Sequence, residues 1–182
     1  IHKQKKGEEM KNLINSINST INKKSINVLL FSGDVDLIKS TLRFNSNINI
    51  NAVNEKGETA LFQASYEVAE VLIKHGIDIN HQDNKGNTAL FYSDFLTTGM
   101  LIMYGIDVNI NNDLGMNALF MCDISKARVL INAGINVNKR TKVGYTAFQY
   151  AFINRDVSLA DLMIEAGLLM TYKEQLKLER II

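Results

Sequence analysis

The sequence predicts an all-α solenoid built from short stacked repeats, and three observations support this prediction. A six-residue motif occurs four times, as GETALF at 57–62, GNTALF at 86–91, GMNALF at 115–120 and GYTAFQ at 144–149. Each copy begins 29 residues after the one before it. A second motif keeps the same interval, as HGIDIN at 75–80, YGIDVN at 104–109 and AGINVN at 133–138. Self-similarity at a fixed period of about 20 to 50 residues is the signature of a repeat protein.

Each repeat is expected to contain a turn, a short helix, a longer helix and a glycine stop. In the repeat that begins at Gly57, Thr59 is expected to cap the first helix. The second helix, YEVAEVLIKHG at 66–76, carries an apolar stripe at helical spacing, formed by Val68, Val71 and Leu72. Gly76 is expected to end it in the left-handed conformation. One repeat cannot bury such a stripe alone, so the repeats must stack.

The repeats differ in length. The distance from motif glycine to stop glycine is 19 residues between Gly57 and Gly76, but 23 residues between Gly144 and Gly167. The segment INRD at 153–156 supplies the extra turn between the two helices of the last repeat. The first repeat, which includes SINVLLFSGDVDLIK at 25–39 with Gly33 at the turn, is also near full length. We therefore expect three trimmed repeats between two ordinary ones.

Both ends of the chain are expected to cap the solenoid. Residues 8–21 carry a helical stripe of apolar residues, and residues 171–182 form a mixed apolar and charged run. A solenoid needs terminal pieces that shield the ends of its core. The predicted organisation is an N-terminal capping helix at 1–24, about five repeats at 25–169 and a C-terminal capping helix at 170–182.

Composition and charge exclude several classes of protein. The formal net charge is only +1, so the chain lacks the basic character that favours nucleic-acid binding. The single cysteine, Cys122, permits neither an internal disulfide nor a thiolate metal cluster. No apolar run approaches the roughly 20 residues needed to span a bilayer. The chain begins at Ile1 without a signal-peptide pattern, so we expect a fragment of a longer protein.

No motif of the sequence indicates catalysis or metal binding. The GxGxxG and P-loop patterns of phosphate-binding loops are absent. DNKGN at 83–87 is similar to the start of a calcium loop, but Tyr92 stands where an acidic ligand is required. His75 and His81 have no third ligand beside them, so we interpret both as surface histidines.

Two further positions recur from repeat to repeat and are interpreted as packing positions. Cys122 shares its position with the small residues Ala64, Ser93 and Ala151, which favours a buried, unreactive thiol. The other position forms an aromatic column of Phe62, Phe91 and Phe120. A ligand-binding ladder would also use such a column, but core packing between neighbouring first helices is the favoured interpretation.

The residues that change between copies are the candidates for function. They flank each motif glycine or precede a stop glycine, and along the chain they change from charged to polar to apolar. Exposed apolar side chains beside charged ones are typical of a protein-docking surface. The candidate partner-binding residues are Glu55, Lys56, Glu58, His75, Asn84, Lys85, Asn87, Tyr104, Asp113, Leu114, Met116, Lys142, Val143 and Tyr145.

The two motifs together resemble the ankyrin repeat, whose signature is T-P-L-H-x-A within a period of about 33 residues. Alanine replaces the proline at Ala60, Ala89, Ala118 and Ala147, and phenylalanine replaces the histidine in three copies. The resemblance covers roughly residues 25–169. It implies helix-turn-helix repeats with short β-hairpin fingers, and a protein partner that contacts the finger tips and the inner face of the first helices.

The trimmed repeats and the closing KLERII are similar to the C-terminal ankyrin portion of OspC-class type III secreted effectors, the caspase-targeting ADP-riboxanases. This resemblance implies a bacterial protein secreted into the host cell cytoplasm, where it would bind an inflammatory caspase of the human caspase-4-like kind and inhibit pyroptosis. It implies NAD as the cofactor of a separate arginine-modifying transferase domain, and calmodulin as a partner of the rest of the protein. For this fragment we expect no catalytic residue, no metal, no cofactor, and neither nucleic acid nor membrane as a partner. The alternative is a freestanding ankyrin adaptor or inhibitor that binds and blocks a partner protein.

Overall fold

The computed structural model describes residue 12 and residues 27–44 and 48–168. The expected capping helices at 1–24 and 170–182 lie outside the described residues, apart from residue 12, which is helical. Regular structure in the described part of the chain consists of α-helices and short 3-10 helices, without a β-strand. This bears out the all-α prediction.

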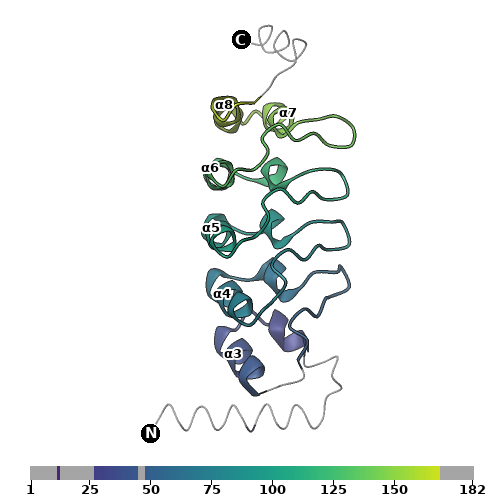
Figure 1. Ribbon diagram of the computed structural model, residues 1–182, viewed down its shortest axis with the longest axis vertical. Helices are drawn as coiled ribbons and strands as arrows, with labels where there is room; N and C mark the ends of the chain where they lie inside the picture. The colour runs from purple at the N-terminus through teal and green to yellow at the C-terminus, as the bar shows by residue number, and fades with distance from the viewer. Residues whose placement is uncertain (1–11, 13–26, 45–47, 169–182) are drawn as a thin grey trace. The chain divides into compact units, whose positions relative to one another are not determined.

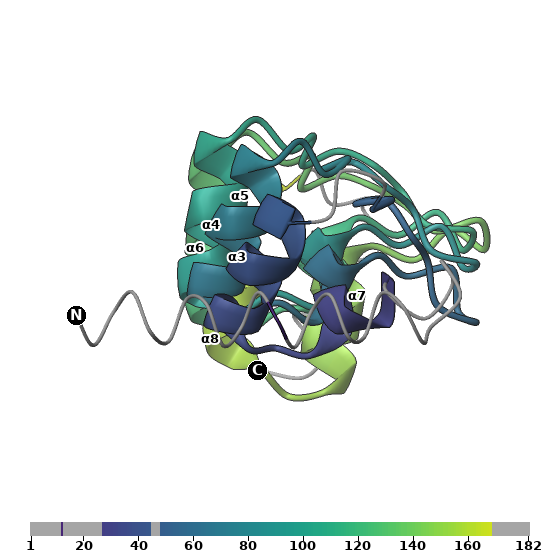
Figure 2. The same ribbon diagram turned by 90° about the horizontal axis from the view of Figure 1, so that it is seen from below.

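The chain divides into two compact units, Ile1–Asp107 and Val108–Ile182. In the first unit, three α-helices each follow a 3-10 helix. Its described elements are η1 (Asn27–Phe31), α3 (Val35–Phe44), η2 (Ala60–Gln63), α4 (Tyr66–Lys74), η3 (Ala89–Phe91) and α5 (Phe95–Met103). Helices α3, α4 and α5 lie side by side in one layer, and the 3-10 helices form a second layer next to the finger loops (Figure 1 and Figure 2).

The second unit repeats this two-layer arrangement. Its described elements are η4 (Ala118–Met121), α6 (Ile124–Asn132), α7 (Ala147–Ile153) and α8 (Val157–Glu165). Helix α6 packs against α8 in one layer, and η4 packs against α7 in the other. Successive repeats therefore stack in register within the unit.

The core of each unit lies between its two layers. In the first unit the apolar stripe of α4 is buried as predicted, with Val68, Val71 and Leu72 all in the interior. The phenylalanines of the aromatic column, Phe62, Phe91 and Phe120, are also buried, which supports their interpretation as core residues. In the second unit Leu119, Leu130 and Met163 are almost fully buried. Residues at equivalent sequence positions thus fill equivalent places in the core of successive repeats.

The first helices of the trimmed repeats are single 3-10 turns because the chain enters the second helix almost at once. Only Ala64 separates η2 from Ser65, whose side chain already caps α4 by accepting from the Val68 amide. A turn shortened in this way leaves no room for a full α-helix. The last repeat, which has four more residues between its glycines, forms the α-helix α7 at this place.

Threonine caps the first helix only where that helix is α-helical. Thr146 accepts from the Gln149 amide and forms a capping box at the start of α7. Thr59, which was expected to cap, makes no side-chain cap bond, and its buried hydroxyl has no hydrogen-bond partner among the described residues. The expectation was wrong for Thr59 because a 3-10 turn does not offer the same amide to the capping side chain.

Asparagines at the end of the second motif, and Asn51 at the equivalent place 29 residues before Asn80, join consecutive repeats. In the first unit the Asn51 Oδ1 accepts from the Asp78 amide at 2.7 Å, and the Asn80 Oδ1 accepts from the Asp107 amide at 2.8 Å. In the second unit the Asn109 Oδ1 accepts from the Asn136 amide, also at 2.8 Å. We call each of these bonds an asparagine rung. The rungs provide hydrogen-bond acceptors for backbone amides in loops, which lie outside the regular hydrogen bonding of a helix or a sheet.

A residue in the left-handed region precedes the second helix in each ordinary repeat. Gly33 has φ +73° in the first repeat, whereas Arg155 adopts φ +59° in the last one. We expect Arg155→Gly to raise the free energy of unfolding by about 1 kcal/mol, because glycine adopts this conformation without steric cost. Urea unfolding followed by circular dichroism measures the change. The control Asn154→Gly, at φ −80°, should be destabilising, and the explanation fails if both variants shift stability alike.

Candidate partner-binding surface

Each finger is a tight turn closed by its own backbone. In the first finger the Asn54 amide donates to the Glu58 carbonyl, and the Gly57 amide donates back to the Asn54 carbonyl, both at 3.0 Å. The Asn54 side chain accepts from the amides of Lys56 and Glu58, which fixes the turn from inside. The expected β-hairpins are reduced to isolated bridges, such as the one between Val53 and Thr59. The fingers are therefore rigid turns and not pairs of strands.

Neighbouring fingers are bonded to each other within each unit. In the first unit the Asn84 amide donates to the Lys56 carbonyl at 2.9 Å. In the second unit the Lys142 amide donates to the Leu114 carbonyl at the same distance. These bonds fix the spacing of adjacent tips, so a partner would meet preformed pairs of tips instead of mobile loops.

The position after the motif glycine is buried in three of the four fingers, which corrects the expectation that Glu58, Asn87 and Met116 are exposed tip residues. In the first two fingers this side chain forms hydrogen bonds with other side chains of its own repeat. The Glu58 Oε2, for example, accepts from the Asn54 and Gln63 side chains at 2.8 and 3.1 Å. Glu58 and Asn87 therefore stabilise the fingers, and Glu58, Asn87 and Met116 are all too buried to be tip contacts.

A buried carboxylate organises the second finger. The Asp83 side chain accepts from the amides of Lys85 and Asn87, from the Asn87 side chain and from the Tyr92 hydroxyl, at distances of 2.8 to 3.1 Å. Burial opposes ionisation of this carboxyl, but the four hydrogen bonds outweigh it and lower the pKa of Asp83. Protein donors thus satisfy the segment that resembled a calcium loop.

The tips of the second unit carry the exposed apolar residues that the sequence predicted. Leu114 is 59% exposed, Val143 is 77% exposed and Tyr145 is 47% exposed. The bond from the Lys142 amide to the Leu114 carbonyl sets the two tips next to each other. The Tyr145 ring meets the Tyr150 ring edge-on, with 6.2 Å between centroids, which steadies its position. We call Leu114, Val143 and Tyr145 the apolar tip cluster.

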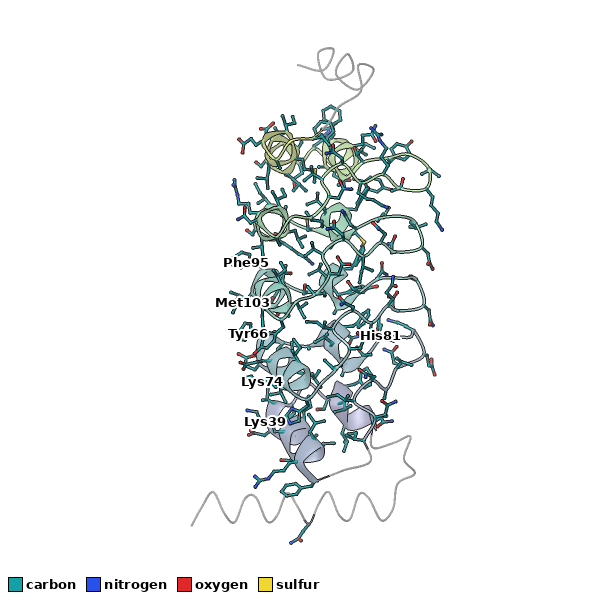
Figure 3. All side chains as sticks on the ribbon, viewed as in Figure 1. Lys39, Tyr66, Lys74, His81, Phe95 and Met103 are labelled. Carbon is teal, nitrogen blue, oxygen red and sulfur yellow. The ribbon has the colours of Figure 1, made fainter. Side chains whose placement is uncertain are left out.

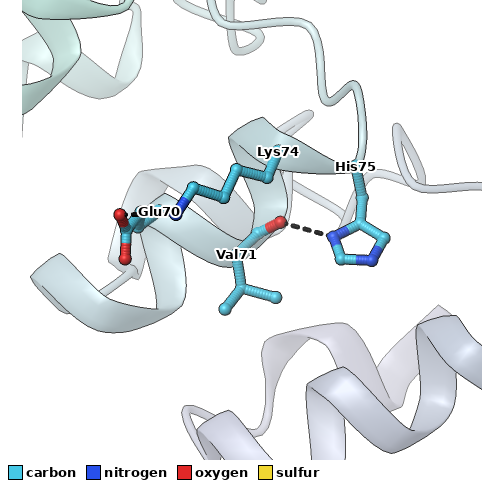
Figure 4. Close-up of polar contacts among 4 residues, drawn as sticks. All are labelled: Glu70, Val71, Lys74 and His75. Carbon is cyan, nitrogen blue, oxygen red and sulfur yellow. Dashed lines mark hydrogen bonds and ion pairs between the residues drawn. The ribbon is translucent and has the colours of Figure 1, made fainter.

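The remaining candidates are exposed but lie in two different kinds of place. The finger residues, in both units, are Glu55, Lys56, Asn84, Lys85, Asp113 and Lys142. His75 and Tyr104 instead follow the last turns of α4 and α5 as C-cap residues. The His75 Nδ1 donates to the Val71 carbonyl at 2.7 Å, beside the Glu70–Lys74 ion pair (Figure 4). The structure does not bring these two residues onto a finger.

His81 is a structural residue that sequence reasoning placed at the surface. Its side chain is half-buried, and the Nε2 donates to the Gly57 carbonyl at 2.8 Å. The ring also meets Phe62 edge-on, with 6.1 Å between centroids. It therefore holds the finger that contains Gly57. His75, by contrast, is exposed as expected.

The chemistry of the lone cysteine agrees with a packing role. Cys122 is half-buried, slightly more open than expected, and its Sγ donates to the Leu119 carbonyl at 3.3 Å. Burial raises the pKa of Cys122 to about 12, so the reactive thiolate is scarce at neutral pH. Among the residues that the structure describes, no group of His, Cys, Asp and Glu side chains is suited to hold a metal ion. Within the same residues, none of the helices is both long and apolar enough to span a membrane.

Two-layer stacked repeats with rigid fingers define a helical-repeat protein. Residues 26–97 match the family model described as "Ankyrin repeats (3 copies)". The four stop glycines, Gly76, Gly105, Gly134 and Gly167, all have positive φ, including those beyond the matched residues. The predicted fold class, an all-α ankyrin-repeat solenoid, is therefore confirmed. Ankyrin repeats generally mediate protein–protein interaction. No curated protein sequence matches the chain significantly.

Proposed function

We propose that this domain docks a host protein for a covalently attached enzyme domain of a secreted bacterial effector. The observation that carries the docking role is the apolar tip cluster of Leu114, Val143 and Tyr145. Isolated exposed apolar residues are common, but three on adjacent, hydrogen-bonded fingers expose one patch to solvent. A protein partner that buries this patch would gain binding free energy from the removal of apolar surface from water.

The tip cluster has the features of a binding hot spot. It combines an aromatic side chain, already packed on Tyr150, with two aliphatic ones, and a rigid anchor loses little conformational entropy on binding. The charged residues Asp113 and Lys142 are also exposed on these fingers, where they form a polar rim. Such a rim sets the orientation of a partner more than its affinity.

The proposed partner is an inflammatory caspase of the caspase-4-like kind. The trimmed repeats and the closing KLERII, which are similar to those of OspC-class effectors, support this partner. On this proposal the protein acts in the host cytoplasm after secretion. NAD serves the transferase domain that modifies an arginine of the caspase, and calmodulin acts on the rest of the protein.

We expect Val143→Asp to weaken partner binding by roughly tenfold or more, because it places an unpaired charge in the centre of the apolar contact. The matched control is Val157→Asp, the same substitution at an exposed position of the same unit. Pull-down of purified caspases by the wild-type chain and both variants, followed by titration, measures the effect. Wild type and Val157→Asp should bind alike.

Two results would contradict the proposal in different ways. If the wild-type chain retains no caspase at low or physiological salt, the proposed partner is wrong. If caspase binds and Val143→Asp binds as tightly as wild type, the partner is right but the apolar tip cluster is not the interface.

A further inference from the structure

Helix α5 exposes an apolar face that the docking proposal does not use. The helix, FLTTGMLIM at 95–103, contains no charged residue. Met103 is 85% exposed and Leu96 is 63% exposed, and Phe95 is about half exposed. Figure 3 shows Phe95 and Met103 on the side of α5 that faces away from the 3-10 helices. Exposed apolar surface of this kind marks a contact site in many proteins.

The preceding repeat shows what an ordinary solvated face looks like at these positions. In α4 the equivalent residues, 29 positions earlier, are Glu67, Glu70 and Lys74. Glu70 and Lys74 form an ion pair at 2.7 Å on the helix surface (Figure 4). In α5 the same three positions hold Leu96, Gly99 and Met103. The face that is charged in one repeat is therefore apolar in the next.

Gly99 has no function within the described part of the chain that would require glycine. It lies in the middle of α5 without a positive φ, and a Cβ added there would meet nothing within 4 Å. Glycine at such a place costs about 1 kcal/mol of helix stability relative to alanine. Gly99 is half-buried, and what a glycine at a helix surface does provide is close approach of another backbone. The glycine and the apolar residues around it point to the same conclusion, that something packs on this face.

We propose that α5 packs against α5 of a second copy of this chain, antiparallel around a two-fold axis at Gly99. Large apolar residues lie at equal distances on both sides of Gly99 in the sequence. Phe95 and Met103 are each four residues from Gly99, and Leu96 and Ile102 are each three residues from it. An antiparallel pair therefore sets each Phe95 opposite a Met103 and each Leu96 opposite an Ile102, and methionine against an aromatic ring is a favourable contact. Because α5 carries no charged residue, the two α5 helices bring no like charges together where they meet.

The size of the apolar face is consistent with weak self-association. Tyr104 at the end of α5 and Tyr66 on the adjacent α4 extend the face, and both are exposed. The exposed face thus comprises Tyr66, Phe95, Leu96, Met103 and Tyr104. At roughly 200 Å² for a large side chain, the exposed parts of these five side chains add up to on the order of 500 Å² per copy. Two copies would bury about twice that, near the lower limit for a specific interface. We therefore expect a dimer that forms at micromolar or higher concentration.

Sedimentation velocity over a concentration series tests the proposal with the full chain. The wild-type chain should shift from monomer to dimer, and Met103→Glu should remain monomeric at every concentration. Met103 is too exposed for this change to unfold the helix, which circular dichroism will verify. The matched control is Ile153→Glu, another exposed apolar residue, which should dimerise like the wild type. A wild-type chain that is monomeric throughout, or a Met103→Glu variant that dimerises equally well, would overturn the proposal.

Two variants at Gly99 test the geometry. Gly99→Ala should make the monomer more resistant to heat but shift dimer formation to higher concentration, since the added methyl separates the two helices. Gly99→Cys in a Cys122→Ala background should form a disulfide-linked dimer on mild oxidation, because the two-fold axis places residue 99 beside its own copy. A dimer that tightens with Gly99→Ala, or that does not cross-link through residue 99, would show that α5 is not at the axis. These residues differ from the apolar tip cluster, so failure here leaves the docking proposal intact.

Discussion

Replacing Gly57 with alanine should destabilise the protein by about 3 kcal/mol, whereas the same change at Gly76 should cost only about 1 kcal/mol. Both glycines have positive φ, +76° and +84°, so both substitutions strain the backbone. At Gly57 the added Cβ would also overlap the Asn84 side chain and lie 2.9 Å from the Asn84 amide nitrogen. At Gly76 the Cβ would meet nothing within 4 Å.

The difference in destabilisation between the two variants therefore measures the free-energy cost of disturbing the contact between neighbouring fingers. Urea unfolding of both variants gives the two free energies, with the denaturant slope compared because repeat arrays can lose cooperativity. Asn84→Gly in the Gly57→Ala background should recover part of the lost stability, since it removes the overlapping side chain. Equal destabilisation by Gly57→Ala and Gly76→Ala would mean that the fingers separate at no cost.

Asp83→Asn should destabilise the protein by about 2 to 3 kcal/mol at pH 7. The carboxylate accepts four hydrogen bonds in the second finger, and an amide in its place turns one acceptor oxygen into a donor that faces Asn87 and Tyr92. Two donors, the buried Asn87 side chain and the Tyr92 hydroxyl, then lose their acceptor. Asp113→Asn, at an exposed finger position, is the control and should change the free energy of unfolding by less than about 0.5 kcal/mol.

The effect of Asp83→Asn should also depend on pH. The pKa of Asp83 is lowered in the folded chain, so its ionised form stabilises the fold above the unfolded pKa of about 3.9. This contribution is lost as the pH falls through the lower, folded-state pKa. Unfolding of wild type and variant should therefore converge in acid, and a constant gap down to about pH 2 would rule out the proposed network as its source.

The repeat frame could be predicted from the sequence because each of its residues is written several times. The stop glycines, the stripe of α4 and the buried phenylalanines all recur at one interval, so a single physical explanation had to fit every copy. The exposure of Leu114 and Val143 followed from the same register. The four copies within this one chain thus provide the alignment that related sequences provide for a protein without repeats.

The direction of individual side chains could not be predicted in this way. The position after the motif glycine holds Glu58, Asn87, Met116 and Tyr145, which share no polarity, yet the first three are buried and only the tyrosine is exposed. Their orientation depends on the finger turn and on partners up to five residues away. His81 is a harder case, since its partner carbonyl at Gly57 lies 24 residues back along the chain.

The apolar face of α5 was also missed, although its signal was present. The charged residues of α4 are replaced in α5 by Leu96, Gly99 and Met103. The predicted binding residues lie on the fingers or, as with His75 and Tyr104, at the ends of the second helices, so the face itself was not among them. A position-by-position comparison of equivalent helices would have found the change.

The asparagine rungs bear on how such a chain changes over evolutionary time. Each rung joins one repeat to the next through an acceptor in one and a backbone amide in the other, as between Asn51 and Asp78 or between Asn109 and Asn136. A backbone amide is present whatever residue occupies the receiving position. Duplication or loss of a whole 29-residue unit therefore leaves every remaining junction with both of its bonding groups. The array can therefore gain or lose one repeat at a time without requiring new contacts between adjacent repeats.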